Sequence, residues 1–372
     1  MFGEVLAAVV LRRRAPAPSG ARPRVAVLVP AHDESNNCLS TIGDIKGQLR
    51  PGDRLLVVAD NCTDDTAAVA AAGGAEVVAR QDPQRIGKGY ALDFGLAHLQ
   101  ADASDVVVVV DADCRLAEDA LDRLAERCAA TGRPVQALYL MHAPDHSDIT
   151  HRVAEFAWCV KNEVRPLGLA ALGFPCQLMG TGMAMPWDGA QCVDLATGHM
   201  VEDLKLGVDL ALVQRPPLFC PEARVTSTFP ASDAATKSQR ARWEQGHLGL
   251  IFSTAPRLLL RALGRRDLQL IMMALDLAVP PLVLLMLLLV AGIATTAIAA
   301  GLGASVVPLG VVLAAATLFS VALIMAWARF GRTILPLRSF PELGSYVLAK
   351  LGLYGRLAAG SHQTRWVRTD RD

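Results

Sequence analysis

The strongest constraint on the fold is the stretch VVVVVDAD, residues 106–113, in which five consecutive valines end in two carboxylates. β-branched side chains favour strands, and an unbroken apolar run suits a strand that is buried on both faces of a sheet. In an open α/β sheet, the carboxyl ends of parallel strands border the crevice where ligands bind. Asp111 and Asp113 are therefore expected to project into that crevice.

These two carboxylates have two interpretations. Two hard oxygen ligands suit Mg²⁺ or Mn²⁺, which would in turn hold the oxygens of a diphosphate. The sequence Asp-Ala-Asp also occurs in ordinary β-turns whose acids are solvated. The rest of the chain decides between a metal site and a turn.

Composition and charge limit the classes of protein to which this chain can belong. Of the 372 residues, 52% are hydrophobic, and because the apolar residues concentrate near the C-terminus, they imply a membrane part. The formal net charge of zero argues against a general nucleic-acid binder, which needs an excess of Lys and Arg. The eight cysteines form no CxxC pair and have no histidine at zinc spacing. We therefore expect a reduced, cytosolic catalytic part with most cysteines buried.

The first part of the chain alternates strands with helices. Short apolar strands are predicted at 24–30, 54–60 and 75–79, and a helix at 88–99 leads to the valine strand. This alternation predicts a parallel sheet with right-handed crossovers. Acids follow three of the strands near one crevice: Glu34, Asp60, and the pair Asp111 and Asp113.

The middle of the chain is less regular. A helix is predicted at 118–130, a strand at 134–141, and an amphipathic helix at 151–170. Gly180 and Gly182 then interrupt an apolar stretch, either because the backbone approaches a ligand closely or because it turns tightly between strands.

Residues 1–23 comprise a short apolar segment and a basic linker. The apolar residues 1–11 are too few to cross a bilayer, and the arginines that follow are in the wrong order for a secretory signal. The segment is interpreted as an interfacial anchor, or as the end of a transmembrane helix that begins before the given sequence.

The C-terminal third predicts a membrane part. After a basic interfacial segment at 251–267, apolar stretches at 268–300 and 306–328 form a transmembrane hairpin within 268–330. Arginines flank both outer ends, which places those ends and the catalytic domain in the cytosol. Asp276 within the first stretch must face protein or water, and Pro280 with Pro281 can kink the helix. Residues 331–372 are expected to hold a membrane-interface helix, at 343–359, and a basic tail.

Four stretches carry a family resemblance: VPAHDES, VVADNCTDDTA, GKGYALDFGL and VVVVDADC, in that order. They resemble the nucleotide-binding half of a family 2 glycosyltransferase with the GT-A fold. The resemblance implies a Rossmann-like, mostly parallel α/β catalytic domain, here at 24–250. It also implies nucleotide contacts near Pro30, Ala31, Glu34 and Asp60, a diphosphate near Lys88, and a divalent metal on Asp111 and Asp113. The alternative for Lys88 is a solvated loop lysine.

Asp203 lies in HMVEDLKLGVDLAL, where the apolar spacing after it is helical. Acids at a helix N-terminus ordinarily cap the helix and stabilise its dipole, which is the preferred interpretation for Glu202. In the resembled family, the aspartate of this Glu-Asp pair is the general base that deprotonates the acceptor hydroxyl. One carboxylate opposite the leaving diphosphate suffices for inverting transfer, so the resemblance assigns Asp203 this role.

The most discriminating motif is SQRARWEQG, residues 238–246. Gln239, Arg242 and Trp243 match Gln-x-x-Arg-Trp, the signature of the cellulose, chitin and hyaluronan synthase branch. On a helix, Gln239 and Arg242 are one turn apart on one face. An indole can stack on a sugar ring, and an arginine can meet a diphosphate. The alternative is a membrane-facing helix with an arginine and an interfacial tryptophan.

The resemblance therefore implies an inverting transferase that moves a sugar from a nucleotide-sugar donor, of the UDP type, to a polysaccharide or glycan acceptor. It would work with Mg²⁺ or Mn²⁺ at the cytosolic face of a membrane, in bacteria the inner membrane, with export or assembly partners and no nucleic acid. Relatives that export a chain carry more transmembrane helices, so a closed pore in a monomer is not expected. Two alternatives are the transfer of a single sugar to a ceramide, diacylglycerol or polyprenyl-linked lipid, and a catalytically silent nucleotide-sugar-binding subunit of a polysaccharide secretion complex.

Overall fold

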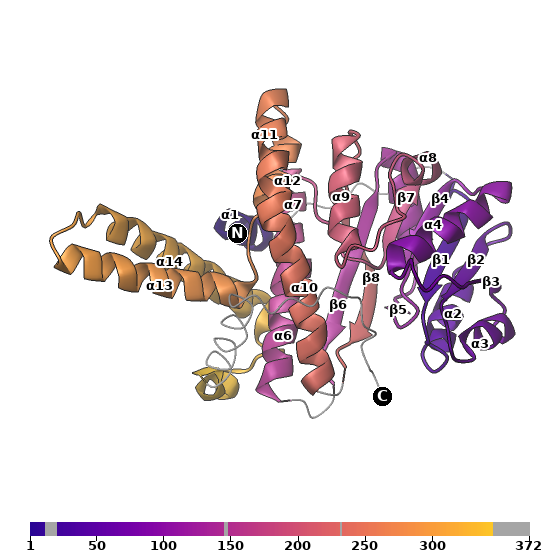
Figure 1. Ribbon diagram of the computed structural model, residues 1–372, viewed down its shortest axis with the longest axis horizontal. Coiled ribbons are helices and arrows are strands. Elements are labelled where there is room, and N and C mark those ends of the chain that lie inside the picture. The colour runs from indigo at the N-terminus through magenta and orange to yellow at the C-terminus, as the bar shows by residue number, and fades with distance from the viewer. Residues whose placement is uncertain (12–20, 145–147, 231–232, 345–372) are drawn as a thin grey trace.

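The computed structural model describes residues 1–11, 21–144, 148–230 and 233–344, and in Figure 1 a sheet and a helical hairpin occupy opposite ends of the molecule. Most of the expected linker, the helix expected at 343–359 and the basic tail lie outside these residues. The predicted combination of an α/β domain with a C-terminal apolar hairpin is confirmed.

Within the described residues, one eight-stranded sheet has the order β3-β2-β1-β4-β7-β6-β8-β5. Its first four strands pair in parallel, as expected for strands that alternate with helices. They are β3 (Glu76–Arg80), β2 (Arg54–Asp60), β1 (Val25–Ala31) and β4 (Val106–Val109). Their order places the carboxyl ends of β1, β2 and β4 side by side, at the edge where the acids were predicted.

The second half of the sheet is mixed, which the sequence did not indicate. β7 (Met183–Pro186) is antiparallel to both β4 and β6 (Val135–His142), whereas β8 (Leu218–Thr228) is parallel to β6 and antiparallel to β5 (Arg115–Leu116). β7 was not predicted because four residues after two glycines give too little periodicity. It extends the sheet beyond the valine strand and joins it to β6.

Helices cover both faces of the sheet. In β1, Val25, Val27 and Val29 pack on one face and Ala26 and Leu28 on the other, as the two-residue period of a strand requires. The first face is covered by α2 (Cys38–Lys46), α3 (Thr66–Ala72) and α5 (Ala120–Thr131), and the second by α4 (Lys88–Leu99) and α9 (Glu202–Leu212). The short α8 (Trp187–Ala190) follows β7. All eight cysteines are free and six are buried, as predicted.

The helix predicted at 151–170 contains a change of helical type. α6 (Ile149–Cys159), whose first turn is capped by Asp148, continues into a π-helical turn, Val160–Val164, and then α7 (Arg165–Leu172). Side chains of this segment hold it against β6, because Trp158 Nε1 and Asn162 Nδ2 donate to the Tyr139 carbonyl at 3.1 and 3.3 Å. π-helical turns inside α-helices often occur at functional sites.

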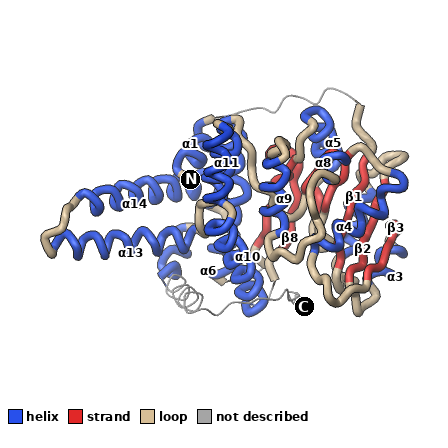
Figure 2. The backbone as a smooth tube through the Cα atoms, turned by 45° about the horizontal axis from the view of Figure 1, so that its top comes forward, coloured by secondary structure: helices blue, strands red, loops and turns tan. Residues whose placement is uncertain are grey.

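The apolar hairpin consists of α13 (Leu282–Gly301) and α14 (Val307–Ala326), followed by a π-helical turn at Trp327–Gly331. These helices are long and apolar enough to cross a membrane. They project away from the rest of the protein, and α10 (Asp233–Ser253) and α11 (Ala255–Arg265) run crosswise to them at their base (Figures 1 and 2).

The first apolar stretch does not form one span from Leu268. The helical conformation is interrupted at Pro280 and Pro281, so α12 (Leu268–Leu277) is a separate helix. It is buried against α9 and α11 through Leu270, Met273 and Leu277, among other residues. Hydropathy alone cannot distinguish such a buried helix from a membrane span, whereas the acid and the two prolines mark the boundary.

The apolar N-terminal segment forms α1 (Phe2–Val10), which packs against α7 and α14 rather than standing alone at an interface. Its backbone lies so close to α7 that a Cβ on Gly168 would come within 1.8 Å of the Glu4 carbonyl oxygen. α1 also brings Glu4 to a buried cation: Arg165 Nε donates to Glu4 Oε2 at 2.7 Å, and Arg165 pairs with Asp276 of α12. This ion network therefore joins three helices at the base of the hairpin.

We expect Arg165→Met to destabilise the protein by about 3–5 kcal/mol, because it leaves the buried carboxylates of Glu4 and Asp276 without their cation. The exposed fractions of the three side chains are 9%, 7% and 8%, respectively. Thermal unfolding of the detergent-solubilised chain measures the effect. Arg123→Met, which removes an exposed arginine from α5, is the matched control. A shift no larger than that of the control would show that the network contributes no stability.

Candidate active site

A cavity of about 390 Å³ lies between the carboxyl edge of the parallel strands and the helices at the base of the hairpin. Strands β1, β2 and β4, the loops before α4 and α9, and helices α6 and α10 all contribute to its walls. Every site residue predicted from the sequence lines it: Pro30, Ala31, Glu34, Asp60, Lys88, Asp111, Asp113, Asp203, Gln239, Arg242 and Trp243. The structure thus brings together residues that are up to 213 positions apart, while their individual roles stay predictions.

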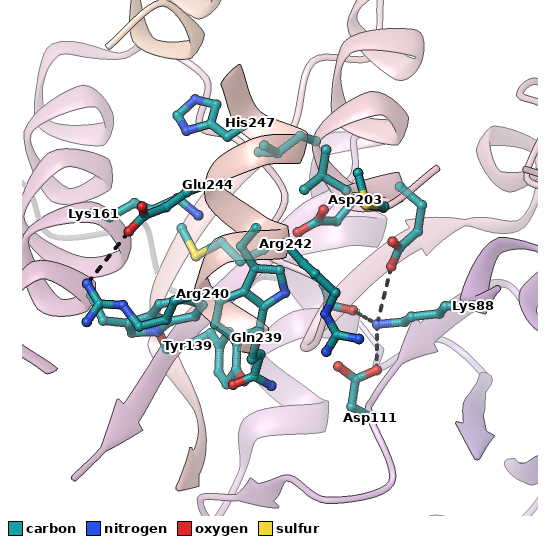
Figure 3. Close-up of a pocket in the computed structure, with 18 of the residues that line it drawn as sticks. Lys88, Asp111, Tyr139, Lys161, Asp203, Gln239, Arg240, Arg242, Glu244 and His247 are labelled. Carbon is teal, nitrogen blue, oxygen red and sulfur yellow. Dashed lines mark hydrogen bonds and ion pairs between the residues drawn. The ribbon is translucent and has the colours of Figure 1, made fainter. Parts of the chain in front are cut away.

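Lys88 is held at the first residue of α4 and points across the cavity (Figure 3). Its Nζ lies 2.5 Å from Asp111 Oδ1 and donates to the Gly180 carbonyl at 2.7 Å. Burial alone would lower the pKa of Lys88, but the charges of Asp111 and Glu202 raise it above its ordinary value. Lys88 is therefore a permanent cation beside the predicted metal ligands, and not a solvated loop lysine.

Asp111 and Asp113 follow β4, and together with the Cys114 thiol they form a group whose ligand atoms lie within 4.8 Å of one another. The pKa of the buried Cys114 thiol is raised by desolvation, so the thiol stays protonated and is a poor ligand. Two carboxylates remain, which match the oxygen preference of Mg²⁺ and Mn²⁺. The backbone N–H of Asp111 donates to Thr181 Oγ1 at 3.0 Å, which holds this turn in place.

The two glycines flanking Thr181 both adopt a backbone conformation that favours glycine. Gly180 has φ +93° and exposes its carbonyl to Lys88, and an added Cβ would lie 3.6 Å from Asp203 Oδ2. Gly182 has φ +63°, and an added Cβ would come within 2.7 Å of Ala137 Cβ. Gly180 therefore allows a close approach in the cavity, and Gly182 allows the tight turn into β7.

The nucleotide side of the cavity contains Glu34 and Asp60. Asp60 is buried, and its Oδ1 accepts from Arg80 Nη1 at 2.6 Å. Glu34 accepts from Asn37 Nδ2 at 2.9 Å. Both carboxylates border the same space as Pro30 and Ala31, as a nucleoside-binding edge requires.

Glu202 and Asp203 lie in the first turn of α9, the position in which acids stabilise the helix dipole. Glu202 Oε1 also lies 3.9 Å from Lys88 Nζ, so Glu202 lines the cavity as well. Burial raises the pKa of Glu202 to about 8, against the opposing charge of Lys88. Burial also raises the pKa of Asp203, while the ammonium groups of Lys161 and Lys88 oppose the rise. The two carboxyl groups therefore lie in one cavity but next to different cations, Glu202 near Lys88 and Asp203 near both Lys161 and Lys88.

The Gln-x-x-Arg-Trp motif lies on α10 with its three side chains along the cavity (Figure 3). Gln239 is 5% exposed, and its buried Oε1 has no hydrogen-bond partner among the described residues. The Trp243 ring packs on Trp158 with centroids 5.1 Å apart. The helix is therefore part of the cavity wall and not a membrane-facing segment.

Sequence reasoning missed several lining residues: Trp158, Lys161 and Arg165 of the α6–α7 segment, Tyr139 of β6, and His247 of α10. The first three are spaced three and four residues apart, so they share one helical face. A lysine one turn after a tryptophan in an amphipathic helix was the available signal. Burial lowers the pKa of His247 to about 4, so this histidine is neutral near pH 7.

The fold and the cavity define an α/β nucleotide-binding domain with carboxylates at the ends of parallel strands, joined to an apolar hairpin. A family model described as "Glycosyltransferase like family 2" matches residues 23–246, which is more than half of the chain. The chain therefore belongs to this family of glycosyltransferases.

Individual relatives are more distant. A glucosyl-3-phosphoglycerate synthase of Mycolicibacterium paratuberculosis is 39% identical over 99 residues, and the match spans 24% of this chain and 28% of the relative. The mannosyltransferase PcManGT of Pyrobaculum calidifontis, solved with GDP-Man and Mn²⁺, aligns with a TM-score of 0.50 and 17% identity over 88% of this chain and 92% of that chain.

A glucosyl-3-phosphoglycerate synthase of Mycobacterium tuberculosis, solved with Mn²⁺, UDP and glucosyl-3-phosphoglycerate, covers 66% of this chain and 84% of that chain. It aligns with a TM-score of 0.40 at 24% identity. At these identities, the likeness to PcManGT establishes the fold.

Proposed function

We propose that this protein is an inverting glycosyltransferase that moves a sugar from a nucleotide-sugar, of the UDP type, to an acceptor at the cytosolic face of a membrane. The observation that carries the proposal is that one cavity contains Asp111, Asp113, Lys88 and Asp203 and extends to the first residues of the apolar hairpin. The residues proposed to bind the donor and those next to the membrane hairpin therefore line the same cavity.

The donor occupies the strand side of the cavity. Glu34 and Asp60 accept hydrogen bonds from the base and the ribose hydroxyls, and Lys88 balances the charge of the diphosphate. Asp111 and Asp113 would hold Mg²⁺ or Mn²⁺, which when bound supplies further positive charge to the diphosphate oxygens. Arg242 and Gln239 face this region from α10.

Asp203 acts as the general base. Its carboxylate takes the proton of the acceptor hydroxyl as the hydroxyl oxygen bonds to the anomeric carbon. The bond from that carbon to the diphosphate breaks, and the nucleoside diphosphate leaves. The raised pKa of Asp203 suits a base that must accept a proton near neutral pH.

The membrane side is defined by two features. α13 and α14 have the length of membrane spans, and α11 lies crosswise at their base (Figure 1). α11 buries Leu258 and Ala262 but exposes Leu260 and Leu263. Its arginines, together with those just after it, suit the anionic surface of a bilayer: Arg257, Arg261, Arg265 and Arg266. We infer that α11 lies in the cytosolic interface, as proposed for segment 251–267.

The acceptor supported best is a membrane lipid, rather than the polysaccharide or glycan that the family resemblance suggests. The cavity is lined by Val279, Pro280, Pro281, Leu282 and Val283, where α12 ends and α13 begins. An acceptor anchored in the bilayer can therefore reach Asp203 without crossing a pore. A growing glycan remains the second candidate, because Trp158 and Trp243 present aromatic rings suited to sugar stacking.

Turnover with a panel of labelled nucleotide sugars tests this proposal. The full chain is purified in a membrane mimetic with Mg²⁺ or Mn²⁺, and products are separated by size and organic extraction. A single-sugar product in the organic phase is the expected result. A high-molecular-weight product would select the glycan acceptor, and tight UDP binding without turnover would select the silent subunit.

The raised pKa of Glu202 predicts that kcat/KM for the donor falls at alkaline pH. Below about pH 8 its carboxyl group is neutral, and as the pH rises through about 8 it gains a negative charge beside Lys88. This charge repels the diphosphate, so kcat/KM for the donor should fall up to about tenfold per pH unit above the pKa. Glu202→Gln cannot ionise and should remove this limb, whereas Glu222→Gln, outside the cavity, should keep it. Identical profiles for Glu202→Gln and the unaltered protein would contradict the prediction.

A further inference from the structure

Lys161 is a cation in the cavity wall for which the transfer reaction described above has no use. It lies in the π-helical turn Val160–Val164 and lines the cavity one helical turn beyond Trp158. Figure 3 draws it on the opposite side of the view from Lys88 and Asp111, so it lies away from the diphosphate side. Its ammonium group is 5.3 Å from the centroid of the Trp158 ring.

Helical spacing explains why Lys161 faces the cavity, because Trp158, Lys161 and Arg165 are three and four residues apart and form the face that borders it. The two residues after Lys161 have partners elsewhere: Asn162 donates to the Tyr139 carbonyl, and Glu163 accepts from the Cys159 thiol at 3.5 Å. The segment therefore presents a lysine to the cavity while the residues next to it are anchored in the protein.

Lys161 lacks an anionic partner. Among the described residues, no carboxylate oxygen lies within 4.0 Å of its Nζ, and it makes no hydrogen bond. Its neighbour Arg165, by contrast, is paired with both Glu4 and Asp276. A partly buried ammonium group without a counterion is costly unless a ligand supplies the negative charge.

The surroundings of Lys161 indicate which ligand this is. The charges of Asp203, Arg165 and Asp276 all act on its ammonium group. The wall of the same cavity includes Pro280 and Leu282 at the start of the hairpin. Lys161 therefore shares one cavity with the proposed general base and with the apolar residues next to the hairpin.

We propose that the ammonium group of Lys161 binds a phosphate group carried by the acceptor. This inference rests on the proposed transferase activity, because it concerns the acceptor side of the same cavity. A phosphate at Lys161 and an apolar chain at the hairpin base fit a lipid-linked phosphate, and the hydroxyl of the group that this phosphate carries would lie at Asp203. The same chemistry would serve a water-soluble phosphate monoester, which the experiment distinguishes.

Equilibrium binding without donor tests the proposal on the full chain in detergent. The probes are a labelled polyprenyl phosphate, the polyprenol of the same chain length, and glycerol 3-phosphate. The variants are Lys161→Met and Lys161→Arg, with Lys46→Met as the control, since Lys46 is exposed on α2 and remote from the cavity. Binding of UDP with Mn²⁺ to each variant reports whether it is folded.

We expect the polyprenyl phosphate to bind at least tenfold more tightly than the polyprenol, and Lys161→Met to remove this difference. Lys161→Arg should keep binding within about threefold, and Lys46→Met should match the unaltered protein. If only glycerol 3-phosphate binds in a way that depends on Lys161, the phosphate site is supported and its acceptor is water-soluble. If Lys161→Met, still able to bind UDP, loses affinity for neither phosphate, the proposal is overturned. Absence of donor turnover in the unaltered protein would instead refute the transferase activity.

Discussion

Asp203→Asn should reduce sugar transfer by about 10²- to 10⁴-fold, the range expected when a general base is removed. Asparagine keeps the size of the side chain but cannot accept the acceptor proton. Affinity for the nucleotide should change little, because Asp203 lies beside Gly180 and not among the metal ligands. Rates of nucleotide release and product formation, with saturating donor, measure the effect.

The matched control for this variant is Asp209→Asn, on the same helix, where the carboxylate pairs with Lys205. It should retain nearly full activity. A variant Asp203→Asn that keeps more than a tenth of the transfer rate would exclude Asp203 as the base and direct attention to Glu202.

Asp111→Asn should abolish metal-dependent donor binding, with the Kd for UDP in Mn²⁺ rising by at least about 100-fold. Neutralising this carboxylate removes a ligand for the metal and leaves Lys88 without its partner at 2.5 Å. Asp113→Asn should behave similarly. Titration of UDP with and without Mn²⁺ measures the change.

Asp93→Asn serves as the control, because Asp93 is exposed on α4 and does not line the cavity. It should bind UDP as the unaltered protein does. If Asp111→Asn and Asp113→Asn both keep Mn²⁺-dependent UDP binding, the two aspartates are turn residues and the metal site lies elsewhere.

The donor half of the protein could be predicted from the sequence because its signals are local. The valine strand, the helix Lys88–Leu99 and the strand Arg54–Asp60 have the predicted type and position. Parallel topology then brings Asp60 and Asp111 to one edge without further information. For the same reason, the predicted residues at the ends of these strands share one cavity.

The acceptor half depends on contacts between distant segments. β7 and the pairing of β6 with β8 arise from chain segments whose own patterns are weak. Apolar composition also failed to separate the buried α12 from α13, which is long and apolar enough to cross a membrane, since only tertiary packing decides the difference. Lys161 and Glu202 belong to the cavity because of how the α6–α7 segment and α9 pack, which local rules such as helix capping do not reveal.

The most direct test of the central claim is release of nucleoside diphosphate by the purified full chain, supplied with nucleotide sugars, Mn²⁺ and a membrane lipid extract. The account predicts metal-dependent release from at least one donor, with transfer of its sugar into the lipid fraction and loss of both in Asp203→Asn. No release from any donor, by a protein that is folded and loaded with metal, would contradict it.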